Sequence, residues 1–193
     1  MAKVQIKGRL SSIMLLVGFI VTPILFVACN KPIPEGEIPS EGECPTEGEL
    51  PEVENPLHGL NFSPFTELNQ DPNWTVITEE QIKEKLNIVS PYTHWLRTFG
   101  CTRNLDKVAR LGRECGKKVA IGAWLSRDLQ ANETEIESLC QLLRKGLVDL
   151  AVVGSETLLR GDLTEEQLVS YIQRVKACAN GIPVTTGEIY QNY

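Results

Sequence analysis

The chain has 193 residues, of which 42% are hydrophobic and 23% charged, a composition that suits one globular domain with accessory segments. Its net charge of −6 lies mainly in residues 30–56, which carry eight Glu against one Lys. Residues 57–193 are nearly neutral and show no basic stripe, which argues against nucleic acid as a partner.

Residues 1–29 predict an export signal. Three basic residues precede an apolar run at 13–28 that ends at Cys29. The run is short for a hydrocarbon core of about 30 Å and contains Pro23, as is typical of a signal peptide. Residues 25–29, LFVAC, resemble a bacterial lipobox whose cysteine is lipidated, although Phe26 stands where Leu is usual. We therefore expect a lipid-anchored protein of the bacterial cell envelope, outside the cytoplasm. The alternative is an ordinary signal peptide or signal anchor with an incidental cysteine.

Residues 30–56 form an acidic linker rich in Pro, Gly and Glu. Residues 34–51 repeat a hexapeptide three times, as PEGEIP, SEGECP and TEGELP. A proline at every sixth position blocks helix formation and the like charges repel one another, so the segment should be extended. The sequence predicts a stalk between the membrane anchor and a folded domain at 57–193.

Strand and helix patterns alternate through residues 57–193. The apolar runs that predict strands lie at 57–63, 93–98, 118–123, 147–153 and 182–186. Helices are predicted between them, with capping residues at Thr78, Asn132 and Thr164 and an apolar face at 105–111. Units of about 30 residues in this order predict an α/β fold with a parallel sheet covered by helices.

The pattern favours a TIM barrel of the (β/α)8 type over a nucleotide-binding sheet. No GxGxxG or GxxxxGK[ST] motif follows a predicted strand. Polar and aromatic residues instead follow the carboxyl end of each strand, where a barrel of this type builds its active site. Such a barrel needs eight strands and about 250 residues. We therefore expect the fold to be truncated after the fifth strand.

The six cysteines give no sign of a metal site, because none of them forms a CxxC pair. Export would permit disulfides. Cys115, Cys140 and Cys178 fall on predicted helices, where we expect buried free thiols. We expect neither a metal nor an organic cofactor.

Glu156 is the candidate catalytic residue. It follows the fourth predicted strand in the sequence Val152-Val153-Gly154-Ser155-Glu156, and the glycine lets the backbone turn tightly. This position should place the carboxylate over the barrel mouth and shield it from water, as a general acid that protonates a glycosidic oxygen requires. A surface Glu at the start of a loop is the plain alternative. Glycoside hydrolysis generally needs a second carboxylate on the opposite side of the bond.

The strand ends resemble glycoside hydrolase family 17, the β-1,3-glucanase family, in its bacterial branch. The resemblance rests on five motifs in order across residues 57–193: GLNFSPF at 59–65, LRTFG at 96–100, GAWL at 122–125, VGSETLLRGDL at 153–163 and PVTT at 183–186. It implies a barrel that acts on β-glucan by a retaining mechanism, with Glu156 as the general acid/base. It also implies a nucleophilic Glu after the seventh strand, which this sequence does not reach.

Other residues at the strand ends are candidate sugar contacts, and the family usually has Asn where this chain has Ser155. Aromatic faces suit pyranose rings, although packing at the barrel top would explain them equally well. Arg97 is predicted to bind sugar hydroxyls or to orient Glu156, with a structural ion pair as the alternative. The candidate substrate-binding residues are Asn61, Phe65, Arg97, Phe99, Trp124, Ser155, Glu188 and Tyr190.

Three hypotheses follow. In the first, the chain is the N-terminal part of a β-glucan hydrolase or transglycosylase, and it is inactive by itself because the nucleophile is missing. Glu188 is a weak substitute, since it would share a side with Glu156 rather than face it. In the second, the chain is a non-catalytic glycan-binding lipoprotein. In the third, it is a fragment whose open sheet exposes an edge and folds poorly.

Overall fold

The structure is a computed structural model, and it describes residues 53–189. The predicted export signal at 1–29 with Cys29, and most of the predicted linker, lie outside the described residues, as does Tyr190. Within the described residues five strands alternate with four α-helices. The strands are β1 (Leu57–Asn61), β2 (Thr93–Arg97), β3 (Lys118–Ala123), β4 (Leu150–Ser155) and β5 (Val184–Gly187). The α-helices are α1 (Glu79–Val89), α2 (Lys107–Glu114), α3 (Leu129–Arg144) and α4 (Glu165–Cys178), and a 3₁₀ turn, η1 (Ser90–Tyr92), precedes β2.

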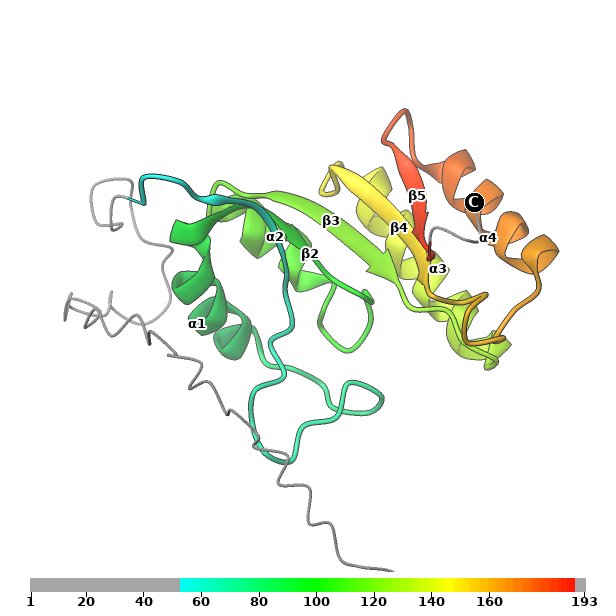
Figure 1. Cartoon of the computed structure of the whole chain (residues 1–193), viewed down its shortest axis with the longest axis horizontal. Coiled ribbons are helices and arrows are strands. Elements are labelled where there is room, and N and C mark those ends of the chain that lie inside the picture. The colour runs from blue at the N-terminus through cyan, green and yellow to red at the C-terminus, as the bar shows by residue number, and fades with distance from the viewer. Residues whose placement is uncertain (1–52, 190–193) are drawn as a thin grey trace, which may run out of the picture. The chain divides into compact units, whose positions relative to one another are not determined.

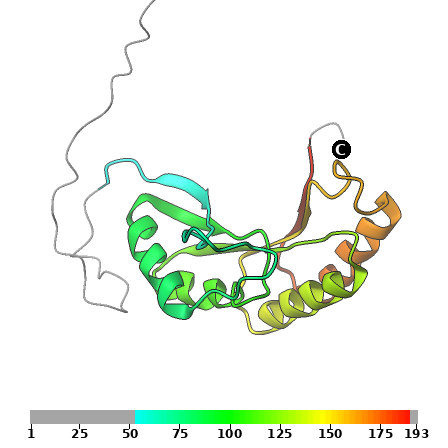
Figure 2. The same cartoon turned by 90° about the horizontal axis from the view of Figure 1, so that it is seen from below.

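The five strands form one parallel sheet in the order β1-β2-β3-β4-β5. Figures 1 and 2 show the sheet curving with all four α-helices on one face and with β1 and β5 at its two edges. Every connection passes through a helix on that face, as a right-handed β-α-β repeat requires. The described residues therefore form half of a (β/α)8 barrel, and the predicted fold class is confirmed.

The core lies between the sheet and the helices in two clusters. One joins β2 to α1 and α2 and contains the fully buried Ile82, Leu86 and Leu96. The larger one joins β3, β4 and β5 to α3 and α4 through side chains such as Ile121 and Leu139. The central strands β3 and β4 are buried almost throughout, whereas the edge strand β1 is largely exposed. The half-barrel is therefore open to solvent at this edge.

The predicted starts of the fourth strand and of the third helix are wrong, and the end of the first strand and the start of the fifth also differ by two residues. The fourth strand begins at Leu150 rather than 147, because Leu147 and Val148 leave α3 in a turn and pack into the core there. The cap of α3 is Asp128, whose side chain accepts hydrogen bonds from two amides of the first turn. Asn132 lies one turn further and is bonded instead to both backbone groups of Ser126, at 2.8 Å each.

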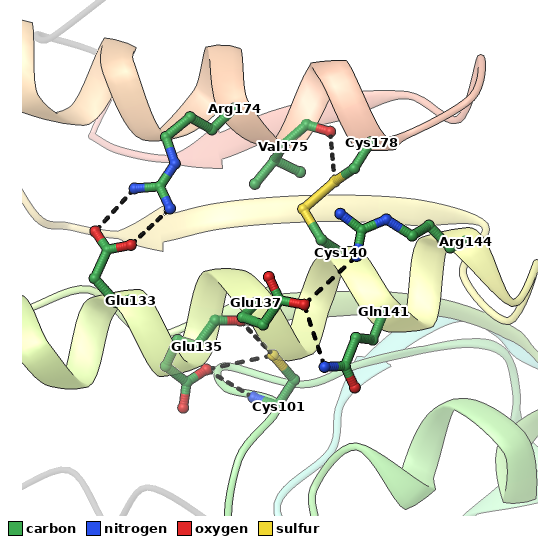
Figure 3. Close-up of a disulfide and its surroundings, with 10 residues drawn as sticks. All are labelled: Cys101, Glu133, Glu135, Glu137, Cys140, Gln141, Arg144, Arg174, Val175 and Cys178. Atoms are coloured by element: carbon green, nitrogen blue, oxygen red, sulfur yellow. Dashed lines mark hydrogen bonds and ion pairs between the residues drawn. A yellow bond between two sulfur atoms is a disulfide. The ribbon is translucent and has the colours of Figure 1, made fainter.

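The expectation of free thiols on the helices is also wrong. Cys140 of α3 and Cys178 of α4 form a disulfide with a Cα–Cα distance of 5.6 Å (Figure 3). Cys115 is disulfide-bonded as well. Among the described residues the free thiol is that of Cys101, which is fully buried. Hydrophobic periodicity could not reveal the pairing, since a half-cystine and a buried thiol occupy the same positions on a helix.

The same pair of helices is joined by an ion pair. Arg174 of α4 donates two hydrogen bonds to Glu133 of α3, at 2.8 and 2.6 Å (Figure 3). These bonds hold the pKa of the Glu133 carboxyl below its usual range. The helix pair that backs β4 is therefore tied covalently at one point and by an exposed ion pair at another. No helix within residues 53–189 combines the length and apolar character that a bilayer span requires.

Candidate functional site

Glu156 directly follows β4 and lies at the carboxyl end of the sheet. Its backbone φ is +53°, a left-handed conformation that is disfavoured for a residue with a Cβ. Its amide donates a 2.7 Å hydrogen bond to the carbonyl of Gly187 at the end of β5. The side chain is exposed, and within residues 53–189 its carboxylate accepts no hydrogen bond. The predicted shielding from water is therefore not supplied by this half of the barrel, because five strands leave one side of the mouth open.

Gly154 makes the turn before Glu156 possible. Its φ is +78°, and the pairing of β4 with β5 is irregular between Val152 and Ser155. A Cβ at this position would lie 2.5 Å from the Oγ1 of the buried Thr157. The predicted role of the glycine in a tight turn is confirmed. The irregular pairing bends the end of β4, so that Glu156 points away from the sheet.

Arg160 ties the loop after β4 to the end of β3. Its guanidinium donates to the carbonyl of Ser155, to the carbonyl of Leu125 at 2.8 Å and to the Asp162 carboxylate at 2.6 Å. The same guanidinium lies over the Trp124 ring, 4.3 Å from its centroid. Because all these groups are fixed by one planar side chain, the backbone on the N-terminal side of Glu156 is held in place.

Arg97 crosses the inside of the half-barrel from the end of β2. Its Nη2 donates to Ser155 Oγ at 3.3 Å, and its guanidinium lies 4.9 Å from the centroid of the Phe99 ring. Gly187 leaves the space that Nη2 occupies, since a Cβ there would lie 2.8 Å away. Within the described residues Arg97 forms no ion pair, and its buried Nε has no hydrogen-bond partner. The structure thus brings Arg97 and Ser155 together beside Glu156.

A cleft of about 920 Å³ opens over the carboxyl ends of β1, β2 and β3. Aromatic side chains form much of its wall, and Arg103, Asp128 and Glu135 give it polar groups; the aromatic residues are Phe62, Phe65, Phe99 and Trp124. Phe62 is buried, whereas Phe99 and Trp124 remain 38% and 39% exposed. The two exposed rings therefore present apolar faces to whatever enters the cleft.

The predicted site residues fall into two neighbouring groups. Phe65, Phe99 and Trp124 line the cleft, while Arg97, Ser155, Glu156 and Glu188 surround the ends of β4 and β5. The groups meet where Arg97 lies against Phe99 and Arg160 against Trp124. Asn61 is exposed at the end of β1 and is paired in register with Arg97, outside the lining of the cleft.

Glu188 holds the loop after β4 rather than projecting freely. Its Oε1 accepts hydrogen bonds from the amides of Thr157 at 2.7 Å and Leu158 at 3.2 Å. One carboxylate oxygen is thus occupied by backbone donors, so Glu188 is poorly suited to act as a second catalytic carboxylate. Its predicted contact with substrate stays a prediction.

Sequence reasoning missed Glu135, a buried carboxylate in the wall of the cleft. This residue of α3 is 5% exposed and accepts hydrogen bonds from the amides of Cys101 at 2.9 Å and Trp124 at 3.2 Å, and from the hydroxyl of Thr102. Burial, and next the Glu135 charge, raise the pKa of the Cys101 thiol well above its usual range. A signal was present, since helical spacing puts Glu135 on the face of α3 that carries Leu139.

The side chains of the site suit the binding of sugars. No cluster of three or more His, Cys, Asp or Glu side chains able to hold a metal ion occurs in residues 53–189. Flat aromatic faces and hydrogen-bonding groups can receive sugar rings, and one carboxylate at a strand end can exchange a proton with a bound substrate. Acid/base chemistry on a glycan fits this geometry.

Comparison with known proteins gives the same assignment. Residues 59–193 match the family model described as the BtgE/BtgC glycoside hydrolase domain. A comparison with curated proteins found no relative that matches the chain.

Two solved structures from Rhizomucor miehei are similar to the chain. One is an active-site mutant of a β-1,3-glucanosyltransferase in complex with laminaritriose, at 29% identity and a TM-score of 0.58 over 71% of this chain and 51% of that one. The other is a glycoside hydrolase family 17 β-1,3-glucanosyltransferase, at 30% identity and a TM-score of 0.57 over 69% and 50%.

The chain therefore spans about half the length of the solved structures that it matches. The family match, in contrast, extends over most of this chain, from within β1 to beyond β5. The resemblance that the strand-end motifs predicted is confirmed by both comparisons, and the chain belongs to the BtgE/BtgC glycoside hydrolase domain family.

Proposed function

We propose that this domain acts on β-glucan, with Glu156 as the general acid/base of a retaining reaction. The observation that carries the proposal is the position of Glu156, which follows the fourth strand of a half-barrel whose family is that of glycoside hydrolases. The left-handed turn at Glu156 lifts its carboxylate out of β4 at the edge where barrels of this type bind substrate.

In this reaction Glu156 first protonates the glycosidic oxygen, while a second carboxylate attacks the anomeric carbon and forms a glycosyl-enzyme intermediate. Glu156 then removes a proton from water, which gives hydrolysis, or from a sugar hydroxyl, which gives transfer. The family resemblance places the second carboxylate after a seventh strand, whereas residues 53–189 contain five strands. We infer that these residues supply the acid/base half of the reaction and that the nucleophile comes from outside them.

We propose that the cleft over β1, β2 and β3 binds the glucan chain. Its volume of about 920 Å³ is in the range of small-ligand sites, and its exposed rings suit the apolar faces of glucose units. The similar Rhizomucor miehei protein was solved with laminaritriose, a β-1,3-linked trisaccharide, which indicates the probe to use.

Replacement of Trp124 by Ala should weaken laminaritriose binding about ten- to hundredfold, because the ring supplies both stacking area and the surface on which Arg160 lies. The affinity of Trp124→Phe should fall between those of the wild type and Trp124→Ala, since phenylalanine keeps a smaller aromatic face. Isothermal titration calorimetry measures this on the chain without any need for turnover. Trp74→Ala, at an exposed ring outside the lining of the cleft, is the matched control and should bind as the wild type does. Equal affinity of Trp124→Ala and the wild type would remove the cleft from the proposal.

A non-catalytic glycan-binding role is the second candidate. Two observations favour it: Glu156 is exposed, and Glu188, its neighbour in the site, accepts hydrogen bonds from backbone amides. This role predicts laminaritriose binding with no cleavage under any condition, and no effect of Glu156→Gln on affinity. Product analysis after long incubation of laminarin with a form of the protein that supplies the nucleophile separates this role from the enzymatic one.

We also propose that the domain works outside the cytoplasm, on the bacterial cell envelope, held there by lipid on Cys29. The disulfide between Cys140 and Cys178 supports an oxidising compartment, since such bonds are rare in cytosolic proteins. Cys29→Ala should abolish incorporation of labelled palmitate and release the protein from the membrane fraction. Cys101→Ala is the control, because that cysteine is a free thiol and its removal leaves the disulfide between Cys140 and Cys178 intact. Full labelling of the Cys29 variant would contradict the anchor.

A further inference from the structure

Three consecutive amides at the start of the loop after β4 are all bonded to the end of β5. The amide of Glu156 donates to the Gly187 carbonyl at 2.7 Å. The next two amides, of Thr157 and Leu158, donate to Glu188 Oε1 at 2.7 and 3.2 Å. Two adjacent residues of one strand end therefore bind three adjacent residues of another, and Glu156 is the first of the three.

This arrangement matters because Glu156 is held in a conformation that its own backbone disfavours. Its φ of +53° is left-handed although it has a Cβ, and Gly154 two residues earlier is left-handed as well. A residue in this region of backbone space needs surrounding contacts to keep it there. The bonds from Glu188 fix the peptide groups that follow Glu156, while Arg160 fixes the carbonyl that precedes it.

We propose that Glu188 is a positioning residue, whose carboxylate keeps the amides of Thr157 and Leu158 in place and thereby aims the side chain of Glu156. The inference rests on the proposed role of Glu156 as acid/base for its functional meaning. It gives Glu188 a role different from a sugar contact or a second catalytic carboxylate.

Two conservative substitutions of Glu188 change its charge and its side-chain length separately. Both amide bonds end on the same oxygen of Glu188, so Glu188→Gln offers an acceptor at the same place without the charge. Glu188→Asp does the opposite, because it keeps the charge but withdraws the oxygen by one methylene. A positioning role predicts that Gln resembles the wild type and Asp does not. A catalytic or electrostatic role predicts the reverse order.

The test uses the ¹⁵N-labelled chain as the wild type and as its Glu188→Gln, Glu188→Asp and Glu188→Ala variants. Hydrogen exchange of the Thr157 and Leu158 amides should be more than tenfold faster in the Asp and Ala variants, because the acceptor oxygen is withdrawn or removed and both amides lose their hydrogen bonds. In the Gln variant it should stay within about threefold of the wild type. The three-bond coupling constant between the amide and α protons of Glu156 and the strong nuclear Overhauser effect between them should indicate a left-handed φ. We expect this signature in the wild type and the Gln variant and not in the Asp and Ala variants.

Glu137→Gln is the matched control, since it makes the same chemical change at an exposed residue of α3 and should leave both amides unchanged. Should the Ala variant fail to fold, the comparison of Gln with Asp still decides. Unchanged exchange in the Asp variant, or a Gln variant as fast as the Ala variant, overturns the inference. Failure of the proposed function looks different: Glu156→Gln would then leave turnover intact, while the amides and the left-handed φ would still depend on residue 188.

Discussion

Replacement of Glu156 by Gln should lower the rate of β-glucan cleavage or transfer by about 10²–10⁴-fold, the range that a general acid/base contributes. The amide keeps the shape of the side chain but cannot donate a proton to the glycosidic oxygen or accept one afterwards. Laminaritriose affinity should stay unchanged, because Glu156 does not line the cleft. Rates are measured on a form of the exported protein that supplies the nucleophile. Affinities are measured on the 193-residue chain.

Two controls make the result specific to acid/base chemistry. Glu137→Gln, at an exposed helical site, should retain full activity. An aryl β-glucoside with an acidic phenol as leaving group needs little protonation, so the first step of Glu156→Gln should be far less impaired with it than with laminarin. Equal impairment with both substrates would point to a structural effect, and wild-type rates with laminarin would show that Glu156 is no acid/base.

Removal of the disulfide by a Cys140→Ser/Cys178→Ser double substitution should lower the free energy of unfolding by about 4 kcal/mol. The chain-entropy relation gives this value for a link between residues 38 apart in the sequence. The bond joins α3 to α4, and both helices pack their buried faces against β3 and β4, so its loss acts on the part of the fold that carries Glu156. Urea denaturation of the two proteins measures the difference.

The reduced wild type provides the comparison for this prediction. It should lose at least as much stability as the double variant, because reduction also opens the disulfide at Cys115. The variant should in turn keep some sensitivity to reductant for the same reason. A difference below about 1 kcal/mol between the oxidised wild type and the double variant would show that the ion pair of Glu133 with Arg174 and the shared core already fix the two helices.

Much of the fold could be predicted because parallel strands and covering helices have distinct patterns. Thr78 and Thr164 cap their helices as expected, the latter in a complete capping box with Gln167. Lys118–Ala123 matches its predicted bounds fully. The start of β4 could not be found in the same way, because Leu147 and Val148 are equally apolar in a core turn and in a strand.

Parts of the site depended on contacts that the sequence does not encode locally. The rule that active-site residues follow barrel strands pointed to Arg97, Trp124 and Glu156, and the structure places all three at the carboxyl ends of strands. It could not show that Glu188 reaches back to the amides after β4, since that depends on the position of one strand end relative to another. The partners of Glu135 could not be predicted for a similar reason, because its donors come from the segments that follow β2 and β3.

We propose that this half-barrel presents a glucan-binding cleft beside an acid/base residue at a strand end. The decisive experiment is a titration of the ¹⁵N-labelled chain with laminaritriose, in which the NMR resonances of the backbone amides and the Trp indoles are monitored. We expect saturable chemical-shift changes that are largest at the Trp124 indole and the amides of Thr102 and Ser126 and smaller at Glu156. Shifts confined to the helical face of the sheet, or none at a saturating sugar concentration, would contradict it.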